Sequence, residues 1–119
     1  MYEKFQEWIH DILERGLPNN TVGVGFNIYE ENDKYWSIQV IATDVFTADD
    51  DDWMCEEIFS SEENLFRWKS EDKWEGVLEQ VINLVSAYLD EGKYGNMLRQ
   101  YKGIGVGFVD GDVEIVYQR

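Results

Sequence analysis

The sequence predicts an α+β fold, with a mainly antiparallel sheet of about four or more strands (two hairpins) packed against an N-terminal helix and a central helical pair. Three observations predict it. Apolar residues alternate with other residues in two pairs of segments, they recur at helical spacing elsewhere, and turn-forming residues separate these segments. The chain has 119 residues, 44% hydrophobic and 15% aromatic, so residues 1–119 are expected to form a single domain.

The first elements are a helix and a hairpin. The helix is predicted from apolar residues at helical spacing: Tyr2, Phe5, Trp8, Ile9, Ile12 and Leu13. Gly16 and Pro18 follow as stop signals. Apolar residues then alternate over residues 22–28 and again over residues 36–42, with the polar turn 30–34 between them. Two strands joined by a short polar loop form a hairpin.

Residues 44–70 have the least regular pattern. We expect Val45-Phe46 to extend the second strand, residues 53–59 to form a short strand, and Phe66 and Trp68 to lie on a further extended piece ending at Ser70. Ser70 is a candidate N-cap for the following helix, because Glu71 and Asp72 come next and favour a first turn.

The longest predicted helix follows and ends at Gly92, a candidate C-terminal cap. Its apolar stripe contains Trp74, Val77, Leu78, Val81, Ile82, Val85, Tyr88 and Leu89. A shorter helix, predicted from Tyr94, Met97, Leu98 and Tyr101, ends before Gly103. Asp110-Gly111 between the alternating runs 104–109 and 112–117 predicts a second hairpin.

Glycines alternate in two similar strand segments, Val22-Gly-Val-Gly-Phe26 and Ile104-Gly-Val-Gly-Phe108. Each segment presents one face without side chains, so a helix or a ligand could approach closely, and we expect close packing of a helix. A phosphate-binding loop is not indicated. These glycines lie within predicted strands, and the third glycine of a dinucleotide fingerprint is missing.

Acidic residues dominate the charge of the chain. Thirteen of its 25 Asp and Glu residues fall between Asp44 and Glu79, opposed there only by Arg67, Lys69 and Lys73. This stretch carries a formal charge of −10 out of −15 for the chain, and it contains four consecutive aspartates, residues 49–52. Such a surface favours a basic partner and disfavours nucleic acid and anionic membranes. The aromatic residues within it distinguish it from a disordered acidic tail.

A cytoplasmic location is expected. The segment after Met1 has neither the basic start nor the continuous apolar run of a secretory signal, and no apolar run approaches the length of about 20 residues that crosses a bilayer. The single Cys55 cannot form an intrachain disulfide, which suits a reducing compartment. Glu56 and Glu57 follow it and disfavour a reactive thiolate.

The sequence indicates no catalytic residue, cofactor or structural metal. His10, the only histidine, has no serine or cysteine context that would indicate a catalytic set. Residues 49–52, or Asp110 and Asp112 with Glu114, could attract Ca²⁺ or Mg²⁺ weakly, but neither group follows the EF-hand pattern. One Cys and one His are too few for zinc.

The closing run from Tyr101 to Tyr117, Tyr-Lys-Gly-Ile-Gly-Val-Gly-Phe-Val-Asp-Gly-Asp-Val-Glu-Ile-Val-Tyr, resembles that of small bacterial immunity proteins. The combination of Phe66-x-Trp68, Ser70, Trp74 and a long helix ending near Gly92 resembles them as well. Those proteins protect cells from the toxin domains of contact-dependent inhibition and other polymorphic toxin systems. The resemblance implies a cytoplasmic, non-catalytic inhibitor that binds one toxin domain, often a basic nuclease. It supplies no binding motif, so no family site residue is carried over.

We therefore expect an immunity protein that binds and neutralises a cognate basic toxin domain, a nuclease in particular, through an acidic surface containing aromatic residues. The predicted partner-binding residues are Asp49, Asp50, Asp51, Asp52, Trp53, Glu56, Glu57, Phe59, Glu62 and Glu63. Two alternatives stay open: a small acidic enzyme that uses paired carboxylates in a cleft between helices and sheet, and a generic acidic interaction module. The oligomeric state and the identity of the toxin are not indicated.

Overall fold

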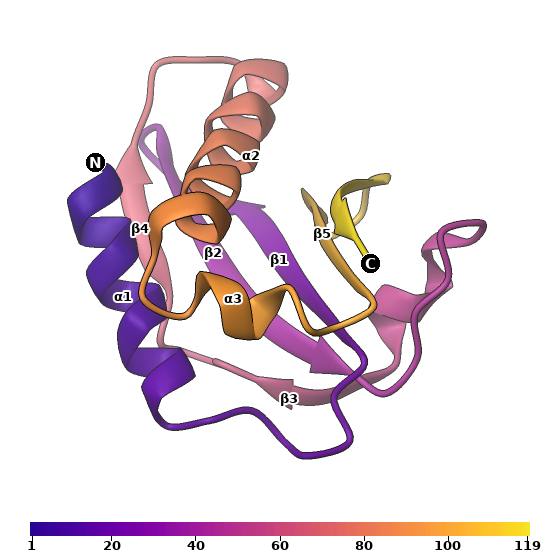
Figure 1. The fold of residues 1–119 in the computed structure, drawn as a ribbon. Helices are drawn as coiled ribbons and strands as arrows, with labels where there is room; N and C mark the ends of the chain where they lie inside the picture. Colours follow the sequence, from indigo (N-terminus) through magenta and orange to yellow (C-terminus); the bar gives the residue numbers. More distant parts are fainter.

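The computed structural model describes residues 1–119 and has the predicted α+β fold (Figure 1). The elements are α1 (Tyr2–Glu14), β1 (Gly23–Glu30), β2 (Tyr35–Thr43), the 3-10 helix η1 (Asp51–Cys55), β3 (Glu57–Ser60), β4 (Phe66–Lys69), α2 (Trp74–Glu91), α3 (Gly95–Leu98), β5 (Gly103–Phe108) and β6 (Val113–Gln118). The N-terminal helix, both hairpins and the central helical pair are thereby confirmed.

The six strands form one sheet in the order β3-β2-β1-β5-β6, and β4 also pairs with β2. The two short strands β3 and β4 lie end to end along the free edge of β2, which pairs with β3 through residues 41–43 and with β4 through residues 35–38. All pairs are antiparallel except β1 with β5. The helices between β4 and β5 return the chain to β1 in the parallel direction.

The main hydrophobic core lies between the sheet and the helices, which cover one face of the sheet (Figure 1). It contains 21 buried residues. The alternating residues of β1 and β2 supply its floor, including Phe26 and Ile38, and α1 contributes Phe5, whose ring packs edge-on to Phe66 at 5.6 Å. Each large side chain buried here contributes about 1.5–3 kcal/mol. None of the helices combines the length and the apolar character needed to span a membrane.

The ends of the long helix differ in detail from the prediction. Helix α2 begins at Trp74 with Lys73 at the N-cap and no capping side chain, so Ser70 is not the cap. The Ser70 hydroxyl instead accepts hydrogen bonds from Asp72 N and Gln80 Nε2, which fixes the loop before the helix. Gly92 does cap the C-terminus, with extended rather than left-handed backbone. A Cβ at this position would lie 2.4 Å from the Tyr88 ring, which is the physical reason for a glycine.

The glycines of β1 and β5 form a surface without side chains on the opposite face of the sheet. The parallel register places Gly23 beside Gly103 and Gly25 beside Gly105. A second, smaller cluster of Ile41, Trp53 and Met54 packs here, with Phe46, Val113 and Ile115 at its border. The structure therefore confirms that a helix packs closely on the glycines, but this helix is η1, a single 3-10 segment.

The prediction that residues 53–59 form one strand is wrong in its first half. Residues 51–55 form η1, and the strand begins at Glu57. The Asp50 side chain accepts a hydrogen bond from Asp52 N at 2.9 Å and caps the 3-10 turn, which is the role that short acidic side chains favour. Burial of Trp53 and Met54 on the glycine surface then requires consecutive residues to face the same side, which a strand cannot provide.

We predict that Gly105→Ala destabilises the protein by about 1–3 kcal/mol, because overpacking an enclosed site forces neighbouring groups apart. The added Cβ would lie 2.9 Å from Trp53 Cζ2 and 2.7 Å from Val113 Cγ1. Gly111→Ala is the matched control, since its Cβ would meet no atom closer than 3.5 Å. Urea unfolding of both variants checks the prediction, and equal unfolding midpoints would contradict it.

Candidate functional site

The chain between β2 and β3 is held to the sheet by aromatic side chains. Trp53 is only 2% exposed, and its ring approaches the Phe46 ring edge-on at a centroid distance of 4.8 Å. Trp53 also contacts the backbone of Gly23 and Gly105, where no side chain intervenes. The sequence predicts Trp53 as a partner-binding residue, whereas the structure leaves almost none of its side chain at the surface. Its side chain is enclosed by its own fold, and its role is to hold the aspartate run in place.

The four aspartates are exposed and lie at or just before η1. Asp50 caps the 3-10 turn, and Asp51 Oδ2 accepts a hydrogen bond from Val113 N at 3.1 Å. The second bond joins the aspartate run to the strand β6, although 62 positions separate the two residues. The aspartate run is thus a structured part of the surface, with Trp53 as its buried support.

The remaining predicted residues follow β3 and the turn after it. Glu56 and Glu57 are exposed at the start of β3, and Glu62 and Glu63 are exposed in the turn to β4. Phe59 is half-buried and packs against the main core, so most of its ring serves the fold. The structure therefore does not gather the ten predicted residues into one patch, but distributes them from the aspartate run along an edge of the sheet.

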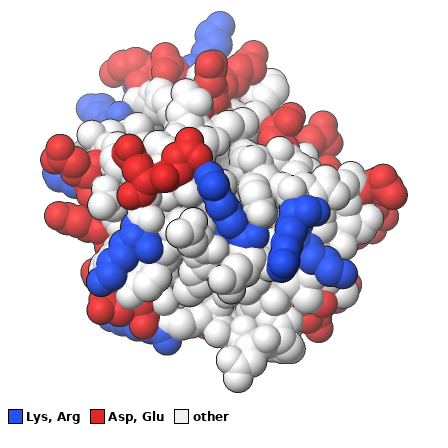
Figure 2. Space-filling model, in the orientation of Figure 1, with Lys and Arg blue, Asp and Glu red and all other residues white.

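None of the eight predicted carboxylates forms an ion pair. The four ion pairs in the structure are His10–Glu14, Lys34–Glu71, Arg67–Glu31 and Arg99–Asp90. Figure 2 shows the face that carries α3 and the C-terminus, where several Lys and Arg side chains gather near the middle and carboxylates lie mostly toward the rim. The charge of the predicted residues is therefore not neutralised within the chain and stays available to a partner.

Three of the predicted carboxylates border a groove on the sheet face opposite the helices. This groove, which we call the Tyr29 groove, has a volume of about 530 Å³, and Asp51, Asp52 and Glu57 lie along it. Its other lining residues are Asn27, Tyr29, Gln39, Met54, Cys55, Phe108, Val109, Gly111 and Val113. Carboxylates beside a polar floor accept hydrogen bonds from cationic side chains, so the groove suits a basic ligand.

Tyr29 occupies the floor of this groove and donates a hydrogen bond to Gln39 Oε1 at 3.1 Å. Burial raises the pKa of Tyr29, and the nearby charges of Glu57 and Asp110 raise it further, because all three oppose formation of the phenolate. Tyr29 and Gln39 were not among the predicted site residues. The sequence could have indicated them, because Tyr29 and Gln39 alternate with the core residues of the first hairpin. This alternation places both side chains on the sheet face away from the helices.

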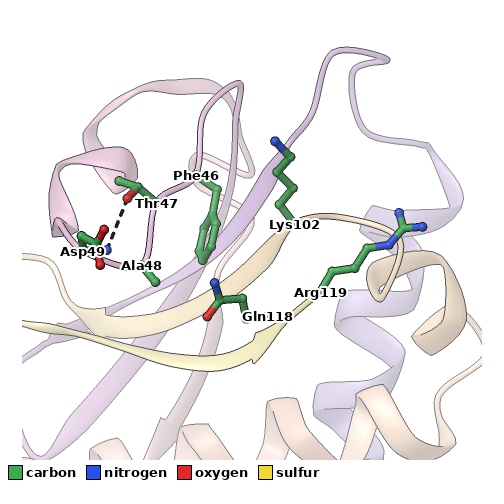
Figure 3. A pocket seen from close by; sticks show the side chains of 7 residues that line it. All are labelled: Phe46, Thr47, Ala48, Asp49, Lys102, Gln118 and Arg119. Carbon is green, nitrogen blue, oxygen red and sulfur yellow. Dashed lines mark hydrogen bonds between the residues drawn. The ribbon is translucent and has the colours of Figure 1, made fainter.

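A second groove opens on the other side of the aspartate run and carries basic residues (Figure 3). It has a volume of about 550 Å³, and Asp49 lines it together with Lys102 and Arg119. Figure 3 shows Asp49 on one side of the Phe46 ring and the two basic side chains on the other. Asp49 therefore belongs to a surface of mixed charge, whereas Asp51 and Asp52 border a groove that has acidic but no basic residues in its lining.

The single cysteine and the single histidine of the chain lie on opposite faces of the sheet. Cys55 is exposed at the end of η1, on the open face of the sheet. His10 lies on α1, on the helical face, where it contacts Glu14 at 3.7 Å and the Tyr94 ring at 5.1 Å between centroids. A cysteine and a histidine separated by the sheet cannot form a catalytic pair. No group of three or more His, Cys, Asp or Glu side chains could hold a metal ion.

Comparisons with protein-family models, with curated proteins and with solved structures gave no match. The function is therefore inferred from the residues and their arrangement.

We predict that Glu57→Gln lowers the pKa of Tyr29 toward its ordinary value of 10.0, because one of the charges that oppose the phenolate is removed. The phenolate then forms at lower pH than in the parent protein. Titration followed by NMR of tyrosine labelled at Cζ measures the change. Glu62→Gln removes the same charge from the turn after β3 and should leave the pKa of Tyr29 unchanged. An unaltered Tyr29 titration in the Glu57 variant would show that this carboxylate does not act on the groove.

Proposed function

We propose that this chain is a cytoplasmic immunity protein that binds and neutralises a cognate toxin domain with a basic surface, a nuclease in particular. The observation that carries the proposal is the set of eight exposed carboxylates at residues 49–52, 56, 57, 62 and 63, none of which has a cationic partner in the chain. Uncompensated charge of this density costs stability through self-repulsion. A basic partner would remove that cost on binding.

The attachment of the aspartate run favours a protein partner over diffuse attraction of counterions. Burial of Trp53 holds the backbone beside the aspartate run, and hydrogen bonds from Asp52 N and Val113 N fix the carboxylates of Asp50 and Asp51, so a partner does not have to order this segment. Preorganised groups lose less conformational entropy on association. A nuclease is the favoured class of toxin because its substrate surface must attract phosphates, and fixed carboxylates can occupy the same basic surface.

The direct test is to express the product of the gene immediately upstream and to purify it together with this chain. We expect a stable complex with the C-terminal domain of that product, and loss of the toxin's activity in the complex. Protection of cells that express both proteins provides the functional readout. A partner domain that carries no basic surface, or that stays fully active when bound, would contradict the proposal.

Given such a complex, we predict that changing Asp49, Asp50, Asp51 and Asp52 to Asn lowers the association rate constant about tenfold or more at low salt and weakens its salt dependence. The physical reason is the loss of electrostatic steering toward the basic partner. Stopped-flow association at increasing salt measures both effects.

The matched control neutralises four exposed carboxylates on the outer side of α1, namely Glu3, Glu7, Asp11 and Glu14. It changes the net charge by the same amount but leaves the aspartate run intact, so the association rate should fall much less. Equal rate losses in the two variants would show that only net charge matters, and that the aspartate run is not the surface that meets the partner.

A further inference from the structure

The most exposed aromatic side chain of the structure is Trp74, at the start of α2. Its exposed fraction is 57%, although its helical spacing predicts a place in the apolar stripe of the helix. The indole packs edge-on against Phe108 at a centroid distance of 6.2 Å, and Phe108 in turn contacts Trp36 at 6.0 Å. Val109, which follows Phe108, is 49% exposed. Within the chain, Phe108 covers one edge of the indole, and most of the Trp74 side chain is exposed to solvent.

Trp74 lines a groove between the β1–β2 turn and the loop that precedes α2. This groove, which we call the Trp74 groove, has a volume of about 610 Å³. Six carboxylates line it, namely Glu30, Glu31, Asp33, Glu71, Asp72 and Glu75. Lys34 and Lys73 are the only basic residues in its lining. Lys34 pairs with Glu71, and Arg67 pairs with Glu31, which leaves Glu30, Asp33, Asp72 and Glu75 without an ion pair.

Hydrogen bonds hold the two walls of the Trp74 groove in place. Trp36 Nε1 donates to the Ser70 carbonyl at 3.2 Å, and Ser70 N donates to the Lys34 carbonyl at 3.0 Å, so the loop before α2 is joined to the first hairpin. Gln80 accepts a bond from Trp68 Nε1 and donates to Ser70 Oγ and Asp72 Oδ2. Trp74 therefore projects from a fixed frame, which reduces the entropy lost when a ligand binds.

We propose that the Trp74 groove binds an arginine side chain of a basic protein partner, with the guanidinium stacked on the exposed indole face and its N–H groups donating to the surrounding carboxylates. The inference rests on the proposed function for the class of partner, and it adds a contact residue outside the predicted set. Tryptophan gives the strongest cation–π contact among aromatic side chains. Arginine suits it better than lysine because the guanidinium is planar and weakly hydrated and can bond carboxylates while it stacks.

The charge of the Trp74 groove favours a basic protein over the other ligands that an exposed tryptophan could bind. A second copy of the chain would bring another formal charge of −15 toward a groove that is itself acidic. A nucleic acid or an anionic membrane would meet the same repulsion. An exposed tryptophan within a mostly acidic polar border also matches the usual arrangement of an interface hot spot, in which a large aromatic group is surrounded by polar residues.

The test uses two synthetic peptides of equal length and charge, one with three arginines and one with three lysines, each separated by glycine and blocked at both ends. The indole N–H resonances of the protein are recorded by NMR during titration, and Trp74→Phe identifies the Trp74 signal. We expect the arginine peptide to shift this signal more than the other indole signals. It should bind about two- to fivefold more tightly than the lysine peptide.

Two variants separate this inference from the proposed function. Trp74→Ala should reduce arginine-peptide binding to the level of the lysine peptide, and far-UV circular dichroism should report an intact fold, because the indole is more than half exposed. Changing Asp49, Asp50, Asp51 and Asp52 to Asn should leave the Trp74 shift in place, since these residues lie outside the Trp74 groove. Loss of the Trp74 shift in that second variant would overturn the placement of the site.

A Trp74 signal that does not move with the arginine peptide would overturn the inference, whether or not the chain binds a toxin domain. Equal affinities for the arginine and lysine peptides would contradict the proposed stacking of a guanidinium on the indole, which is the reason for choosing arginine. Conversely, a selective Trp74 shift together with failure to bind the upstream gene product would support the groove and contradict the proposed function.

Discussion

The contact between Trp53 and the glycines of β1 and β5 is the interaction on which the acidic surface depends. The ring lies against the backbone at Gly23 and Gly105, where a Cβ would come within 2.8–2.9 Å of it. Such an approach requires two neighbouring strands that both lack side chains on the same face, which the parallel register of β1 and β5 provides. The indole, Phe46 and Met54 then offset part of the repulsion that four adjacent aspartates impose.

Two tryptophans in acidic surroundings have opposite roles. Trp53 follows the aspartate run yet is buried, while Trp74 follows Glu71, Asp72 and Lys73 and is mostly exposed. The difference comes from what each side chain can reach. Trp53 faces a surface that glycines have left open, whereas Trp74 begins its helix beside the end of β5, where Phe108 covers one edge of it. Similar local composition therefore produced a structural support in one case and a candidate contact residue in the other.

Most of the architecture was predictable from the spacing of apolar residues, which recur at every second position in strands and about every 3.6 positions in helices. The first hairpin, the helix that ends near Gly16, the long helix before Gly92 and the closing hairpin all follow from spacing and turn residues, because each is stabilised by neighbours close in the chain. The candidate site was predictable only in part. The exposure of its carboxylates follows from their charge, but neither their distribution along η1 and β3 nor the polar floor at Tyr29 and Gln39 can be derived from local sequence.

The sequence by itself determined the fold class, the acidic character of the surface and the unusual openness of two strand faces. Only the tertiary structure decided that these faces lie side by side, because the pairing of β1 with β5 joins segments about 80 positions apart, and local propensity carries no information about such partners. The same pairing decided that Trp53 is buried. Burial depends on the surface that another part of the chain presents, and in this protein that surface consists of glycines.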